Sequence, residues 1–190
     1  MYSIEKQISS KVVYKGYIIN VTVDDIAIEP LDNNSTEQKI IYSKREIVHH
    51  NGGVCCLIKL KNGKIPFVKQ FRYAFKDALL ELPAGKIEKG EDPLSTIIRE
   101  AEEEIGIIPK EVVSMGKIYV SPGISDEVLY LYYIEDYELS KQSFDEDEFL
   151  EPLKIKLDKV CDMVLKGEIV DAKTIVAIMK FMIATKRNNY

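Results

Sequence analysis

Three glutamates, Glu100, Glu103 and Glu104, lie within one short stretch of this 190-residue chain. On an α-helix, residues three and four positions apart share a face, so these carboxylates would crowd together. Such like charges repel one another unless solvent or a cation neutralises them. Mg²⁺ takes oxygen ligands, keeps several waters and is commonly completed by substrate phosphate. The spacing therefore favours phosphoryl or pyrophosphate chemistry assisted by a divalent metal.

The alternative is an acidic helix face that is merely solvated, which is the usual meaning of such a charge run. The flanking residues define the expected helix. Asp92 is a good N-cap, Pro93 suits the first helical position, and Gly106 suits a left-handed C-cap. Arg99 lies beside the acidic cluster and could hold a carboxylate in a bidentate pair.

The remaining elements must position this helix. Alternating apolar residues and turn signals predict strands, whereas helical spacing and caps predict two C-terminal helices. We expect strands at 12–15, 19–28, 40–49, 54–59, 65–71, 79–82, 118–120 and 128–134, and helices at 157–166 and after Asp171. Strands precede and follow one helix without regular βαβ alternation, so the expected class is α+β.

Two regions are expected, residues 1–50 and residues 51–190. The first would form a small antiparallel sheet. Such a sheet is too thin to be stable alone, so it should pack on the rest of the chain or on a partner subunit. His49 and His50 fall at the expected end of its last strand, where neighbouring side chains point to opposite faces. We therefore expect neither a metal site nor a catalytic pair there.

Composition narrows the possible partners. A hydrophobic content of 46% allows a substantial core, and the net charge of −5 argues against nucleic acid as a partner. No apolar run approaches the ~20 residues that span a bilayer, and the first residues lack an apolar signal region. Three cysteines without zinc-like spacing suit a reducing compartment. We expect a cytoplasmic protein that does not bind membranes.

The acidic helix belongs to a longer pattern. Gly85 is followed after five residues by Glu91, and after seven more by residues 99–107, REAEEEIGI. This pattern meets every fixed position of the Nudix box, and the chain thus resembles the Nudix hydrolases, which cleave nucleoside diphosphates linked to another moiety. The resemblance implies an α/β/α sandwich around a mixed sheet.

Further segments resemble the ADP-ribose pyrophosphatases within that family. Residues 68–73 and 81–85 look like the strand and loop that lead into the box, and Pro122 follows Gly106 by sixteen residues, as in that subfamily. The segments 45–48, 145–149 and 171–174 are also similar. One departure is the long polar loop at 30–37. The resemblance covers nearly the whole chain.

The resemblance assigns the metal-binding and catalytic residues. Glu100 and Glu104 would be the main metal ligands, the carbonyl of Ala84 would add a ligand, and Glu103 would assist both metal binding and catalysis. Arg99 would support catalysis by pairing with and orienting these carboxylates, together with Glu91. The implied cofactor is Mg²⁺, with Mn²⁺ as a possible substitute.

The resemblance also assigns substrate contacts and a base. Arg72, Glu81, Arg45 and Glu127 would contact the substrate. A glutamate of the late acidic segment would orient or deprotonate the attacking water. The candidates are Glu146, which we favour, and Glu148, with Asp145 and Asp147 behind them.

The expected function is Mg²⁺-dependent hydrolysis of ADP-ribose to AMP and ribose 5-phosphate. The resemblance implies a homodimer in which residues 1–50 cross to the partner and help to form the base pocket. One alternative is hydrolysis of another nucleoside diphosphate sugar, such as an ADP- or GDP-hexose. A second alternative is a non-catalytic regulator that binds ADP-ribose.

Overall fold

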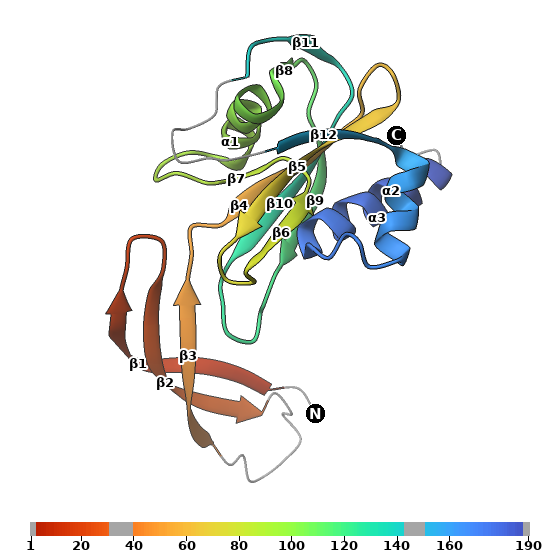
Figure 1. Ribbon diagram of the computed structural model, residues 1–190. Helices are drawn as coiled ribbons and strands as arrows, with labels where there is room; N and C mark the ends of the chain where they lie inside the picture. The colour runs from red at the N-terminus through yellow and green to blue at the C-terminus, as the bar shows by residue number, and fades with distance from the viewer. Residues whose placement is uncertain (1–2, 31–39, 143–150, 188–190) are drawn as a thin grey trace. The chain divides into compact units, whose positions relative to one another are not determined.

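The computed structural model describes residues 3–30, 40–142 and 151–187. Of the polar loop expected at 30–37, all but Pro30 lies outside the described residues, and so do the acidic residues 145–149. Contacts divide the chain into two compact units, each described separately below (Figure 1). Unit 1 comprises Met1–Asn51 with Ser121–Glu127, and unit 2 comprises Gly52–Val120 with Val128–Tyr190. The segment 121–127 thus groups with the N-terminal strands.

Unit 1 contains a three-stranded antiparallel sheet in the order β1-β2-β3. Its strands are β1 (Ser3–Lys15), β2 (Asn20–Pro30) and β3 (Ile41–His49). The predicted first strand, 12–15, was too short. Every residue of β1 is exposed, and polar pairs such as Lys6 with Glu29 and Ser10 with Asp24 join it to β2. A strand that is paired through polar side chains lacks the alternation of apolar residues by which strands are predicted from sequence.

The segment 121–127 is bound to the end of β3. Val48 donates its N–H to the carbonyl of Ile124 at 2.8 Å. The His49 ring lies between Asp126 and Thr22, with Nδ1 at 2.6 Å from Asp126 Oδ2 and Nε2 at 3.0 Å from Thr22 Oγ1. These contacts account for His49 as a structural residue at the strand end.

Unit 2 is built on a mixed four-stranded sheet in the order β7-β4-β10-β9. β4 and β10 are parallel, and the outer pairs are antiparallel. A second, antiparallel sheet has the order β12-β5-β6, and β8 pairs with β11. The strands are β4 (Gly53–Ile58), β5 (Lys64–Arg72), β6 (Asp77–Glu81), β7 (Ala84–Lys86), β8 (Ile107–Pro109), β9 (Val113–Tyr119), β10 (Val128–Ile134), β11 (Tyr137–Leu139) and β12 (Glu151–Lys156).

Helices cover both faces of the central sheet of unit 2 (Figure 1). They are α1 (Pro93–Glu100), which continues as the π-helical turn η1 (Ala101–Ile105), α2 (Leu157–Leu165) and α3 (Ala172–Lys186). This is the predicted α/β/α sandwich of an α+β fold. None of the helices in the described part of the chain has the length and hydropathy needed to cross a bilayer.

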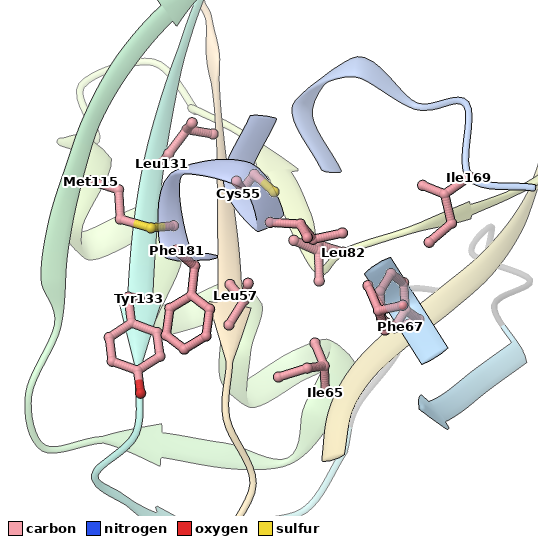
Figure 2. Close-up of a cluster of buried hydrophobic side chains, with 13 residues drawn as sticks. Cys55, Leu57, Ile65, Phe67, Leu82, Met115, Leu131, Tyr133, Ile169 and Phe181 are labelled. Atoms are coloured by element: carbon pink, nitrogen blue, oxygen red, sulfur yellow. The ribbon is translucent and has the colours of Figure 1, made fainter. Parts of the chain in front are cut away.

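All six residues of β4 are buried, so both faces of the central sheet must be covered by other elements. Successive side chains of a strand point to opposite faces. Cys55 and Leu57 pack in a cluster with Phe181 of α3 (Figure 2). Val54 and Cys56 pack on the other face, in the cluster that includes α1. A strand buried on both faces reads as a continuous apolar run, as this one does.

The helical spacing of Ile175, Ile178, Met179 and Met182 predicts an apolar core stripe on α3, and the buried face differs slightly from it. Its fully buried residues are Thr174, Ala177, Ile178 and Phe181. Met179, which we expected in the core, is 48% exposed. Consecutive helical residues point in different directions, so Ile178 and Met179 cannot both face the sheet.

Candidate active site

The helix that carries the three glutamates begins where the sequence predicts. Asp92 caps it, and its Oδ1 accepts hydrogen bonds from the N–H groups of Leu94 at 2.9 Å and Ser95 at 3.1 Å. Pro93 occupies the first position, and Gly106 ends the helical segment with a left-handed φ of 73°. These local capping residues therefore fix both ends of the helix that carries Glu100, Glu103 and Glu104.

The end of this helix differs from the prediction of one regular α-helix. α1 ends at Glu100, and Ala101–Ile105 forms a π turn, which is wider than an α turn and is frequent at functional sites. Glu100 and Glu104 are both buried, at 7% and 3% exposure, whereas the Glu103 side chain is one third exposed. The three carboxylates are thus not equivalent.

Gly85 allows the Glu100 carboxylate to lie against the loop that precedes the helix. A Cβ atom at residue 85 would lie only 1.8 Å from Glu100 Oε1 and 2.5 Å from its Cγ. No side chain fits there unless Glu100 moves. The first glycine of the box is therefore required for space, and it fixes where one acidic side chain lies.

The same loop holds Glu104. The N–H of Ala84 donates to Glu104 Oε2 at 3.1 Å, and Ala84 pairs with Cys55 of the central sheet. One residue earlier, the carbonyl of Pro83 accepts from the N–H of Cys56 at 2.9 Å. The predicted residues Ala84, Glu100 and Glu104 are thus brought together by β4, β7 and the helical segment.

Arg99 donates hydrogen bonds to three glutamates of the acidic cluster. Its Nη1 donates to Glu100 Oε1 at 2.9 Å and to Glu103 Oε2 at 2.8 Å, while its Nε donates to Glu91 Oε1 at 3.1 Å. The pKa of Arg99 is raised above its usual value, most strongly by Glu91 and less by Glu100 and Glu103. In return, Arg99 lowers the pKa of Glu91. One guanidinium therefore offsets the repulsion among three carboxylates.

The donor set fits a hard divalent cation, because carboxylate oxygens are its preferred ligands and Gly85 leaves the Glu100 carboxylate room beside the loop. Within residues 3–30, 40–142 and 151–187, no three His, Cys, Asp or Glu side chains are grouped as a metal site. As the side chains lie, Arg99 bridges Glu100 and Glu103. Glu100, Glu103, Glu104 and the Ala84 carbonyl stay the predicted ligands of the cation.

Arg72 and Glu81 form a second polar group in unit 2. Arg72 donates from Nε to Glu81 Oε1 at 2.6 Å and from Nη2 to Oε2 at 2.7 Å. The Glu81 side chain is only 2% exposed, whereas that of Arg72 is 41% exposed. Burial opposes the charge on Glu81, but Arg72 and Lys173 outweigh it, so the pKa of Glu81 lies below its usual value. Arg72 is thus the member of this pair that can meet a ligand.

The sequence alone indicates no role for Lys173, although the segment 171–174 resembles the family. Lys173 Nζ forms ion pairs with Glu81 and, at 3.0 Å, with Asp171 Oδ1. Glu81 lies 92 positions earlier in the chain. No local pattern could have paired the two residues, because only the tertiary fold brings α3 to β6.

The acidic segment with the candidate bases Glu146, Glu148, Asp145 and Asp147 lies outside the described residues, but both of its flanks are described. Before it, Gln142 Nε2 donates to the carbonyl of Glu104 at 2.6 Å. After it, Glu151 of β12 pairs with Lys69 of β5. The residues on its two sides thus contact the acidic helix and β5, the strand that ends at Arg72.

Arg45 and Glu127 belong to unit 1. Arg45 Nε donates to Glu5 Oε2 at 2.9 Å, and its Nη2 also pairs with Glu5. Glu127 lies 3.5 Å from His50 Nδ1. Their roles in substrate binding remain predictions.

Comparisons with known proteins agree with the family that the residue pattern resembles. The family model described as NUDIX domain matches residues 49–176. The chain is 39% identical to an ADP-ribose pyrophosphatase of Bacillus subtilis (strain 168), over 92% of this chain and 90% of that protein. It is 35% identical to a methanol dehydrogenase activator of Bacillus methanolicus over the same shares, and 31% identical to a GDP-mannose pyrophosphatase of Salmonella typhimurium over 74% and 78%.

A solved structure described as an ADP compounds hydrolase has the same fold. Its TM-score is 0.74 at 14% identity, and the match covers 98% of this chain and 97% of that one. At this identity the likeness concerns the fold alone. It agrees with the α/β/α arrangement of unit 2.

Proposed function

The chain belongs to the Nudix family, and from this membership we propose that it hydrolyses the diphosphate of ADP-ribose with Mg²⁺, giving AMP and ribose 5-phosphate. The 39% identity to an ADP-ribose pyrophosphatase over 92% of the chain supports this substrate. The observation that carries the chemistry is the position of the Glu100 carboxylate in the space where a side chain of residue 85 would lie, since this places one acidic group against the loop.

A bound divalent cation would neutralise the charge of the diphosphate and make it susceptible to water, and Mg²⁺ can be replaced by Mn²⁺ in such oxygen-rich sites. The residues of the chain prepare this step. Arg99 positions Glu100 and Glu103, while the N–H of Ala84 positions Glu104. Arg72, held on one edge by Glu81, meets the phosphates with its other edge.

The base that orients or deprotonates water is assigned to the acidic segment, with Glu146 favoured over Glu148. The described flanks support this assignment, because Gln142 binds the backbone of Glu104 and Glu151 pairs with Lys69. The described flanks are thus joined to the acidic helix and to the strand that ends at Arg72, which are the two parts of the site that the base must serve.

The assembly and location are part of the same proposal. We assign a homodimer, with Arg45 and Glu127 of unit 1 contacting the substrate base or ribose. The fully exposed β1, with apolar residues such as Ile8 and Val12, supports a partner for this sheet. The cysteines Cys55, Cys56 and Cys161 are free thiols, which supports a reducing compartment such as the cytoplasm.

Two other functions have specific support. Similarity to a GDP-mannose pyrophosphatase favours hydrolysis of a nucleoside diphosphate hexose as the second candidate. Similarity to a methanol dehydrogenase activator favours a role as activator of a dehydrogenase. Adding the chain to a purified methanol dehydrogenase would test the latter, since an activator must raise the rate of that enzyme at fixed substrate.

Product analysis tests the proposed reaction. We expect ADP-ribose incubated with the protein and Mg²⁺ to give AMP and ribose 5-phosphate in equal amounts, separated by anion-exchange chromatography. A chelator such as EDTA should stop the reaction, and added Mg²⁺ or Mn²⁺ should restore it. Release of ADP with free ribose, or turnover that persists without metal, would contradict the proposal.

A further inference from the structure

The N-cap and first turn of α3, Asp171–Thr174, supply none of the residues assigned to the metal or the substrate. The residues of this turn contact β6 and the loop that leads to Ala84, through one ion pair and one hydrogen bond. We propose that this turn positions the active site: Lys173 sets the charge around Arg72 through Glu81, and Thr174 fixes the loop before Ala84. The inference rests on the proposed function, in which Arg72 binds the diphosphate.

The first contact belongs to a network of charged side chains around the buried Glu81. Glu81 accepts two bonds from Arg72 and one from Lys173, and Lys173 also pairs with Asp171. Burial opposes the charge on Lys173, yet Asp171 and Glu81 outweigh it and raise the pKa of Lys173 above its usual value. Two cations and two anions therefore balance. Without Lys173 the group would carry one net negative charge.

This balance determines how much positive charge Arg72 can offer. A guanidinium has five N–H donors, and the pair with Glu81 uses those on Nε and Nη2. Among the described residues Nη1 has no hydrogen-bond partner, and the side chain is 41% exposed. One edge is thus held while the other is open to an anion. Since Lys173 offsets Glu81, Arg72 keeps its attraction for phosphate.

The second contact acts on the loop that leads to Ala84. Thr174 is fully buried, and its Oγ1 accepts the N–H of Leu82 at 2.9 Å. The N–H of Thr174 in turn donates to Asp171 Oδ2 at 3.0 Å. Two residues after Leu82, the N–H of Ala84 binds Glu104. Thr174 therefore fixes the backbone that places a metal-binding carboxylate.

Removing each contact should weaken a different binding step, that of the substrate or that of the metal. Lys173→Met should weaken substrate binding, because the net charge near Arg72 becomes negative while Glu100 and Glu104 keep their supports. We expect KM for ADP-ribose to rise roughly tenfold, the size of one charged hydrogen bond, with kcat changed by less than about threefold. Thr174→Val should instead weaken metal binding roughly tenfold and leave substrate binding unchanged.

Conservative variants and a control separate positioning from general structure. Lys173→Arg restores the cation and should restore KM, whereas Lys173→Gln keeps a donor without charge and should give an intermediate KM. Thr174→Ser keeps the hydroxyl and should bind metal normally. Lys186→Met, which removes an exposed lysine from the same helix, should change neither constant.

The experiment combines kinetics with two binding measurements that need no turnover. KM and kcat for ADP-ribose are measured with saturating Mg²⁺. Calorimetry with EDTA gives the Kd for ADP-ribose, and electron paramagnetic resonance gives the Kd for Mn²⁺ alone. Thermal unfolding verifies that each variant is folded at the assay temperature, and Lys173→Gln replaces Lys173→Met if the latter is not.

Opposite results would overturn the inference. If the Lys173 and Thr174 variants match Lys186→Met in all constants, or lose only thermal stability, the turn has no positioning role. A normal KM with a lowered kcat in Lys173→Met would also refute it. If the wild type binds Mn²⁺ but does not hydrolyse ADP-ribose, the proposed function fails, while the Mn²⁺ Kd of Thr174→Val still decides the role of the turn.

Discussion

Gly85→Ala is the sharpest perturbation of the acidic site. The added Cβ would lie 1.8 Å from Glu100 Oε1, so the carboxylate must move by about 1.6 Å to reach an ordinary 3.4 Å contact. A misplacement of about 1 Å in an active site can cost about 100-fold in rate. We therefore expect kcat/KM to fall at least about 100-fold, which corresponds to about 2.7 kcal/mol of transition-state stabilisation.

Gly85→Ala should also lower the stability of the fold, by an amount similar to its cost in catalysis. Moving Glu100 also breaks its hydrogen bond to Arg99, and overpacking typically costs about 1–3 kcal/mol in the free energy of unfolding. The assay is kcat/KM for ADP-ribose with saturating Mg²⁺, together with thermal unfolding. For a domain of this size we expect Tm to fall by about 3–8 °C.

Gly63→Ala is the matched control. Gly63 has a left-handed φ of 74° and no atom within 4 Å of an added Cβ. Alanine there should cost about 1–2 kcal/mol of stability through backbone strain, and kcat/KM should stay unchanged. If Gly85→Ala loses no more activity than Gly63→Ala, the position of Glu100 does not control catalysis and the reasoning is refuted.

Three further predictions concern single carboxylates. Glu104→Gln should lower kcat for ADP-ribose about 1000-fold while far-UV circular dichroism stays unchanged; near-normal turnover would remove Glu104 from the metal ligands. Glu146→Gln and Glu148→Gln are compared by kcat at several pH values, and the variant that lacks the base should lose about 100-fold or more in kcat. If both variants stay active, the acidic segment does not supply the base. Glu81→Gln should cost about 3 kcal/mol in the free energy of unfolding at pH 7, measured by urea denaturation.

The last of these has a definite pH dependence. The pKa of Glu81 is lowered in the folded state from an ordinary value of 4.5, so its ionised form stabilises the fold. That stabilisation is complete above the ordinary pKa and is lost as the pH falls through the lowered one. The stability difference between wild type and Glu81→Gln should therefore be constant from pH 7 to about 5 and shrink below about 4.5. A difference that grows on acidification would contradict this sign.

The features that the sequence predicted well are those set by nearby residues. The ends of the acidic helix are fixed by Asp92, Pro93 and Gly106, because capping depends on residues within one turn. The spacing from Gly85 to Glu104 likewise identified the loop and helix that meet in the structure. Local chemistry was enough for this part of the site.

The features that the sequence missed depend on distant partners or on subtle backbone geometry. The pair of Lys173 with Glu81 spans 92 positions, and the contact of Thr174 with Leu82 spans the same distance. The π turn at Ala101–Ile105 has no residue pattern that separates it from an α-helix. β1 is longer than expected because polar pairs, rather than apolar alternation, join it to β2.

The central claim is that this Nudix enzyme acts on ADP-ribose. The most direct test is kcat/KM for ADP-ribose and for GDP-mannose, measured side by side on the same preparation with saturating Mg²⁺. We expect ADP-ribose to be favoured by at least about tenfold, or about 1.4 kcal/mol of differential transition-state binding. A higher kcat/KM for GDP-mannose would contradict the assignment.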